Sequence, residues 1–294
     1  MHVNARMLAA LAVVYLAWGG TYPAIRVMVE TVPPLIGTGT RFVAAGAVMA
    51  AVLAALGRLR TTRAELTGAA LVGTVILGDI GVLAVAEREV PAGLAALIIA
   101  SVPLWVVVLQ VAHREPVARR TALAVCIGLA GMALLVSPGG EAPVVWLVVL
   151  VAAAAVEAAG QFYSQRARLP DDPLVSTTMQ LLAAGAALLI AGSLAGELGE
   201  VRDARFSDES LLAFAYLVVP GSLVAYSAFV WLLRNVPIGL VATYAYVNPI
   251  VAVAVGALLL GERVTAAMLA GGALILVSVA SLVSHMPRVG PRNQ

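Results

Sequence analysis

Long apolar stretches follow one another along most of this chain, and short polar segments separate them. Each stretch is close to the roughly 20 residues that a helix needs to cross the hydrocarbon core of a bilayer. Ten such helices are expected, at 7–29, 35–56, 68–88, 92–112, 121–137, 144–165, 174–195, 210–233, 238–260 and 265–284. The pattern predicts an all-α integral membrane protein with ten transmembrane helices, because only helices or closed barrels satisfy the backbone in lipid.

One stretch of sequence occurs twice. Residues 90–96 match residues 236–242 at their Val, Pro, Gly, Leu and last Ala positions, and Pro103 and Pro249 follow at the same offset of 146. We interpret the chain as two repeats of five helices, 1–140 and 141–294. Because five is odd, the second repeat must cross the membrane in the opposite sense, which makes inverted repeats of the kind found in secondary transporters.

Arginine placement indicates the orientation. If the N-terminus lies inside, twelve arginines fall in inner loops and tails and four fall in outer loops. Positive residues are enriched on the cytoplasmic side of membrane proteins. The expected location is therefore the cell (inner) membrane, as a multi-pass protein with both termini in the cytoplasm.

The composition excludes several kinds of chemistry. The chain has no lysine, so a phosphate-binding P-loop and lysine Schiff-base catalysis are both excluded. The single cysteine, Cys126, lies in an apolar run, and His2, His113 and His285 lie near segment ends, which does not suit an intramembrane metal site. We expect no cofactor and no metal, and nothing resembles a basic face for nucleic acid.

Two carboxyl groups lie in the middle of expected spans. Asp79 is in the third helix among glycines, and Glu157 is in the sixth helix among alanines. A charge near the centre of a membrane helix costs about 2.5–3.5 kcal/mol. The functional interpretation is a cation-binding or protonatable site. The structural alternative is a protonated or arginine-paired carboxyl that holds helices together.

Other polar and proline residues within spans are candidates for solute contact or movement. Arg41, in the second helix, is a candidate anchor for a carboxylate, or else it extends outward to the interface. Pro103 and Pro249 are expected inside helices four and nine, as hinges or as static kinks. Asn248 adds a polar group beside Pro249.

Several aromatic side chains complete the set of candidates. Trp18, Tyr22, Trp105 and Tyr244 could stack on a planar or amphipathic solute, although such residues also serve in packing and in interfacial belts. Gln161, in the sixth helix, could hydrogen-bond a solute.

The order of short motifs resembles a known family. The matching features are Trp18-Gly19 followed by Pro23, Arg41-Phe42, the two Val-Pro-x-Gly-Leu stretches with their downstream prolines, and Gly261-Glu262-Arg263. In these features the chain resembles the EamA-type family of the drug/metabolite transporter superfamily. It departs from the pattern at Arg114-Glu115-Pro116, where the family prefers Gly-Glu-Arg, and it lacks a Trp-Gly pair in helix six. The resemblance implies a ten-helix carrier with a cavity lined by helices one, three, four, six, eight and nine.

The leading hypothesis is a secondary transporter that exports small metabolites, amino-acid-like or drug-like solutes by alternating access, driven by the solute gradient or by protons. Its partners would be a small-molecule solute, the lipid bilayer and protons. One alternative is a membrane scaffold or receptor that transports nothing. Another is an intramembrane enzyme, but no histidine lies in mid-span, and neither HExxH nor GxSxG occurs.

Overall fold

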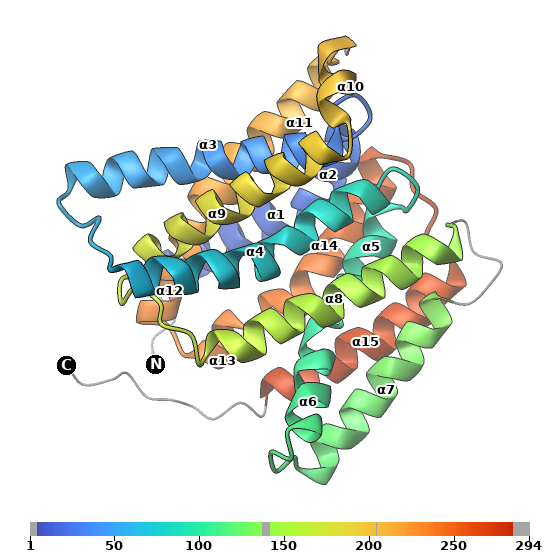
Figure 1. Ribbon diagram of the computed structural model, residues 1–294. Helices are drawn as coiled ribbons and strands as arrows, with labels where there is room; N and C mark the ends of the chain where they lie inside the picture. The colour runs from blue at the N-terminus through green and yellow to red at the C-terminus, as the bar shows by residue number, and fades with distance from the viewer. Residues whose placement is uncertain (1–4, 137–141, 204, 285–294) are drawn as a thin grey trace. The chain divides into compact units, whose positions relative to one another are not determined.

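The computed structural model describes residues 5–136, 142–203 and 205–284, and the regular structure in these ranges is helical (Figure 1). In chain order the elements are α1 Ala5–Gly19, α2 Thr21–Met28, α3 Pro34–Ala55, α4 Arg63–Ala86, α5 Ala92–Ile99, α6 Val102–Ala112, α7 Arg119–Leu135, α8 Val144–Ser164, α9 Pro173–Leu194, α10 Glu197–Asp203, α11 Asp208–Val218, the π-helix η1 Val219–Val224, α12 Ala225–Asn235, α13 Ile238–Val241, α14 Tyr244–Leu259 and α15 Ala266–Ser284. The prediction of an all-α fold is confirmed for the described part of the chain.

Within these ranges, nine helical segments are long and apolar enough to cross a membrane. The one expected span that is not among these nine is the fifth, 121–137. It corresponds to α7, which has 17 residues and is shorter than the nine segments. The expected end of that span at residue 137, and the expected repeat boundary at residues 140 and 141, lie outside the described residues.

Four spans that were expected to be single helices are interrupted. The first breaks at Gly20, between α1 and α2, and the fourth breaks at residues 100–101, between α5 and α6. The ninth breaks at residues 242–243, and the eighth contains η1, in which Pro220 removes a backbone donor. In addition, the segment Glu197–Asp203, expected to be a loop, forms the short helix α10.

The chain divides into two compact units, and each unit contains segments from both expected repeats. Unit 1 consists of Met1–Pro23, Glu89–Ala155 and Val224–Gln294, and unit 2 consists of Ala24–Arg88 and Val156–Leu223. Each unit is described here by itself.

Helix packing in unit 2 is centred on α9, which contacts both α3 and α4 (Figure 1). A β-carbon on Gly39 would lie 2.9 Å from the carbonyl oxygen of Gly185, and one on Gly185 would lie 2.9 Å from the carbonyl oxygen of Gly39. The two glycines therefore let the backbones of α3 and α9 approach closely, as small residues do in membrane helix pairs.

Unit 1 contains a similar helix pair, formed by α7 and α15. A β-carbon on Gly131 would lie 2.6 Å from the carbonyl oxygen of Gly271, and one on Gly271 would lie 2.7 Å from that of Gly131. In the same unit, α14 packs on α5, and α1 packs on both α12 and α14. Glycine at the closest approach thus recurs in both units.

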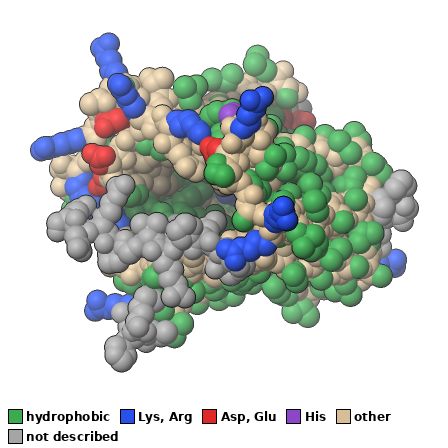
Figure 2. Space-filling model, turned by 90° about the horizontal axis from the view of Figure 1, so that it is seen from below, with side chains coloured by type: hydrophobic (Ala, Val, Ile, Leu, Met, Phe, Trp, Pro, Cys, Tyr) green, Lys and Arg blue, Asp and Glu red, His purple; other side chains and the backbone are tan. Residues whose placement is uncertain are grey.

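Large apolar side chains are exposed along many of the spans, including Leu71, Leu194, Leu212 and Leu258. Hydrophobic side chains lie over much of the face shown in Figure 2. In a membrane this surface is the one that contacts lipid tails, so its exposure fits the prediction of an integral membrane protein.

Arg114 follows α6 and has a φ of 60°, in the left-handed region that glycine adopts without cost. The equivalent residues after α3, α9 and α14 are Gly57, Gly196 and Gly261, all with positive φ. We therefore expect Arg114→Gly to raise the free energy of unfolding by about 1 kcal/mol. The melting temperature in detergent measures the gain. Arg119→Gly, in the first turn of α7, is the control and is expected to lower stability, and a lower melting temperature for Arg114→Gly would contradict the prediction.

Candidate functional site

Asp79 is held in the interior of unit 2 on α4. The helix starts at a capping box, in which the Thr62 hydroxyl accepts from the Glu65 N–H and the Glu65 carboxylate accepts from the Thr62 N–H. The Asp79 side chain is only 6% exposed, and its Oδ1 has no hydrogen-bond partner among the described residues. A buried oxygen without a partner is rare in folded proteins and indicates a place where a proton, water or solute can bind.

Glu157 on α8 lies opposite Asp79 in the same unit. The two carboxyl groups lie within hydrogen-bonding reach of each other. Gln161, one turn further along α8, donates its Nε2 to Glu157 Oε1 at 2.7 Å. Two carboxyl groups can share a hydrogen bond only if one of them carries a proton. The pair, together with its glutamine, can therefore hold and release a proton.

A glycine on α8 explains why the two carboxyl groups meet. Glu157, Gly160 and Gln161 lie on one face of α8, because they are separated by three and four residues. A β-carbon on Gly160 would lie 2.7 Å from Ile76 and 2.9 Å from Val75, both on α4. The missing side chain thus brings α8 against α4 one turn from Asp79.

Arg41 on α3 also lies in unit 2, and its side chain is 3% exposed. Its guanidinium lies over the ring of Phe42, 4.6 Å from the ring centroid. The burial does not fit the alternative that Arg41 extends outward to the membrane interface.

The aromatic candidates Trp18 and Tyr244 meet in unit 1. Their ring centroids are 5.3 Å apart, and Tyr226 and Phe229 of α12 lie 5.2 and 5.0 Å from Trp18. Next to this cluster, the hydroxyl groups of Tyr15 and Thr243 form a hydrogen bond. The rings are packed on one another, so part of their surface is already used in holding α1, α12 and α14 together.

Two further candidates in unit 1 carry buried polar atoms without partners among the described residues. These atoms are Trp105 Nε1 on α6 and Asn248 Oδ1 on α14. A β-carbon on Gly19 would lie 3.0 Å from the Asn248 carbonyl oxygen, so α1 runs directly against this part of α14. Tyr22, on α2, is half-buried and belongs to the same unit.

The two prolines proposed as hinges are placed differently from each other. Pro249 lies inside α14, as expected. Pro103 was expected inside the fourth helix, but it lies in the first turn of α6, directly after the break at residues 100–101. A proline in a first turn removes no helical hydrogen bond, because the first N–H groups have no partner there anyway. Both prolines belong to unit 1.

The structure adds two residues that the sequence did not single out. Phe229 joins the aromatic cluster, and its position three residues after Tyr226 on one helix face could have indicated this. Thr38 lies one turn before Arg41 on α3, is fully buried, and has no hydrogen-bond partner for Oγ1 among the described residues. A threonine in an apolar helix gives no such signal, because it can bond to its own backbone.

Comparison with known proteins identifies the family. The sequence profile of the EamA-like transporter family matches residues 5–137 and again residues 144–284. The chain belongs to the EamA-like transporter family. This confirms the family resemblance seen in the short motifs of the sequence.

Several known proteins are similar to the chain over most of its length. An uncharacterized inner membrane transporter of Escherichia coli K12, YedA, is 37% identical over 88% of this chain and 84% of its own. The protein PecM of Dickeya dadantii is 28% identical over 94% of both chains, and an uncharacterized transporter of Bacillus subtilis, YvbV, is 24% identical over 92% of this chain and 88% of its own. A crystal structure at 20% identity has a TM-score of 0.61 over 97% of this chain and 98% of that one, which shows a shared fold. The chain therefore belongs to a family of multi-pass membrane transporters.

Proposed function

We propose that the protein is a secondary transporter of the inner membrane that exports small metabolites, amino-acid-like or drug-like solutes by alternating access, with proton coupling at Asp79 and Glu157. In this proposal the chain crosses the membrane ten times as two inverted repeats, with both termini in the cytoplasm. Each repeat would take the conformation of the other during the cycle, which would open the protein to one side and then the other.

The observation that carries the coupling is the close approach of α8 to α4 at Gly160 in unit 2, which places Glu157 beside Asp79 so that the two carboxyl groups interact. Ionisable groups inside membrane proteins are costly and often form proton relays. The Gln161 side chain, which donates to Glu157, would orient that carboxyl for proton exchange or for a solute. Arg41 would act in the same unit as an anchor for a carboxylate.

The residues proposed to contact solute in unit 1 are Trp18, Tyr22, Trp105, Tyr244 and Asn248. The free polar atoms of Trp105 and Asn248 support this role, because a solute can supply the missing hydrogen bonds. The aromatic rings offer flat apolar surface for a solute with a planar or hydrophobic part. Pro103 and Pro249 are proposed as points where the spans of unit 1 bend.

The test is solute uptake by purified protein in liposomes. The panel contains amino acids, nucleosides and cationic drugs, each with and without an imposed pH gradient. We expect saturable flux above that of empty liposomes for one class, and we expect the flux to respond to the gradient. Flux that is the same with and without the pH gradient would contradict the proposed proton coupling. The absence of flux for every solute in the panel would contradict the transport of these solute classes.

A further inference from the structure

Four helices of this protein end in the same way. The last turn is followed by a residue with positive φ and then by a charged residue. The four pairs are Gly57-Arg58 after α3, Arg114-Glu115 after α6, Gly196-Glu197 after α9 and Gly261-Glu262 after α14. A left-handed residue at a helix end turns the chain sharply, so the charged residue after it no longer continues the helix.

After α14, the side chain of Glu262 reaches the start of α5 in the same unit. Its Oε1 accepts from the Ala92 N–H at 2.6 Å, and its Oε2 accepts from the Gly93 N–H at 3.0 Å. The first N–H groups of a helix have no partner within the helix, and a carboxylate there satisfies them and complements the helix dipole. Gly256 leaves room for this contact, because a β-carbon there would lie 2.4 Å from Glu262 Oε2.

After α9, Glu197 makes the same contact with α3 in unit 2. Its Oε1 accepts from the Leu35 N–H at 3.2 Å, and its Oε2 accepts from the Ile36 N–H at 2.8 Å. Gly192 takes the place of Gly256, since a β-carbon there would lie 3.1 Å from Glu197 Oε2. Both contacts use the two oxygens of one carboxylate, and the Glu197 side chain is buried.

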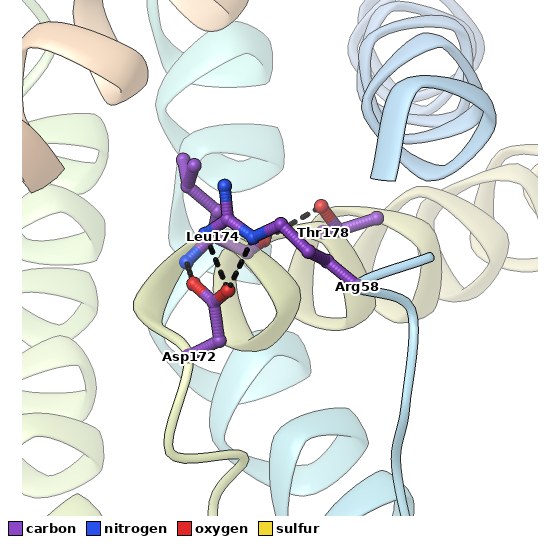
Figure 3. Close-up of polar contacts among 4 residues, drawn as sticks. All are labelled: Arg58, Asp172, Leu174 and Thr178. Atoms are coloured by element: carbon purple, nitrogen blue, oxygen red, sulfur yellow. Dashed lines mark hydrogen bonds and ion pairs between the residues drawn. The ribbon is translucent and has the colours of Figure 1, made fainter. Parts of the chain in front are cut away.

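After α3, Arg58 reaches the start of α9 through an acid (Figure 3). Its Nε and Nη2 donate to Asp172 Oδ2 at 3.1 and 2.5 Å, and Asp172 Oδ1 accepts from the Leu174 N–H at 3.1 Å. The helices α3 and α9 are therefore joined by polar contacts at both ends. The end of each helix holds the start of the other.

The sequence repeat suggests a partner for the fourth charged residue, Glu115. In the repeated sequence, Ile238 and Gly239 correspond to Ala92 and Gly93, and Glu115 corresponds to Glu262. Glu262 ties the end of α14 to the start of the α5–α6 span. By analogy, the expected counterpart joins the end of α6 to the start of the α13–α14 span, and both of these segments belong to unit 1.

We propose that Glu115, Glu197 and Glu262 are positioning residues, whose carboxylates tie span ends to the backbone N–H groups at span starts, with residues 238 and 239 as the partners of Glu115. In unit 1 the two ties fix α6, which carries Trp105, against α14, which carries Tyr244 and Asn248. The expected effect on transport rests on the proposed function of these side chains. The existence of the ties does not depend on that function.

Amide hydrogen exchange of the full-length protein tests the ties directly. We expect Glu262→Ala to speed exchange about tenfold in the segment 90–96 and to leave 236–242 unchanged, as the loss of a helix cap implies. Glu115→Ala is expected to do the reverse. Glu262→Gln and Glu115→Gln keep an acceptor oxygen and are expected to give a smaller effect, and Glu209→Ala, at the exposed start of α11, is the control.

The outcomes separate the parts of the proposal. If Glu115→Ala leaves exchange at 236–242 unchanged, the fourth tie is wrong. For positioning, we expect Glu262→Ala to raise the solute KM several-fold, with Glu262→Gln restoring most of the affinity. Faster exchange with an unchanged KM would show that the tie is structural only. Wild-type protein without any flux would count against the proposed function, while the exchange results would still decide the ties.

Discussion

Replacing Asp79 by asparagine is expected to abolish solute uptake driven by a pH gradient and to leave the folded protein in the membrane. Asparagine has nearly the shape of aspartate and can still hydrogen-bond to Glu157, but it cannot release a proton. Glu157 remains beside the asparagine, but the pair proposed to exchange the proton has lost one of its two carboxyl groups. Uptake into liposomes with an imposed gradient is the measurement, and the expected flux is that of empty liposomes.

A second assay shows which role Asp79 has. Exchange of labelled for unlabelled solute, without any gradient, requires solute binding but no net proton movement. Retained exchange in Asp79→Asn would assign the residue to proton coupling, and lost exchange would assign it to solute binding. Asp171→Asn, in the exposed loop before α9, is the matched control. Gradient-driven uptake equal to that of the wild type would contradict both a coupling role and a solute-binding role for Asp79.

The largest expected loss of stability is that of Gly185→Leu. A β-carbon at this position already lies 2.9 Å from the Gly39 carbonyl oxygen and 2.9 Å from the Val43 nitrogen. Both atoms belong to backbone, which cannot move aside without separating α3 from α9. We expect a cost of about 2 kcal/mol or more, because overpacking of a close contact forces helices apart.

The thermal unfolding of purified Gly185→Leu in detergent measures this cost, together with the fraction that elutes as a single species. The control is Gly199→Leu on α10, where a β-carbon has no heavy atom within 4 Å. We expect a lower melting temperature for Gly185→Leu and little change for Gly199→Leu. Equal melting temperatures for the two variants would show that α3 and α9 have room for a side chain.

The spans were predictable because their apolar runs are long, and because lipid leaves few options for the backbone. The interruptions within spans were not. Gly20 and Pro103 stand in apolar runs of sufficient length, and hydropathy does not register a break of one or two residues. The π-helix η1 was not expected either, since a proline in a helix can also give a simple kink. The short helix α10 has the composition of a loop.

The candidate site was predictable residue by residue but not as an arrangement. A charge in an apolar run is easily found, so Asp79 and Glu157 were identified separately. Their contact depends on Gly160, which lets α8 approach α4 closely. The sequence contains many glycines, and nothing in it distinguishes this one as a point of helix contact. The carboxylate of Glu262 was seen only as part of a motif. Its two bonds to the start of α5 become visible only when distant segments are placed in space.

The π-helix η1 changes the phase of the eighth span. Before it, the buried residues Ser210, Ala213 and Leu217 form one stripe of α11, a helix that contacts α3. After it, α12 packs on α1 and turns Val230 and Leu232 inward. An added residue per turn rotates all later side chains about the helix axis. The two parts of one span therefore meet different neighbours, α3 for α11 in unit 2 and α1 for α12 in unit 1.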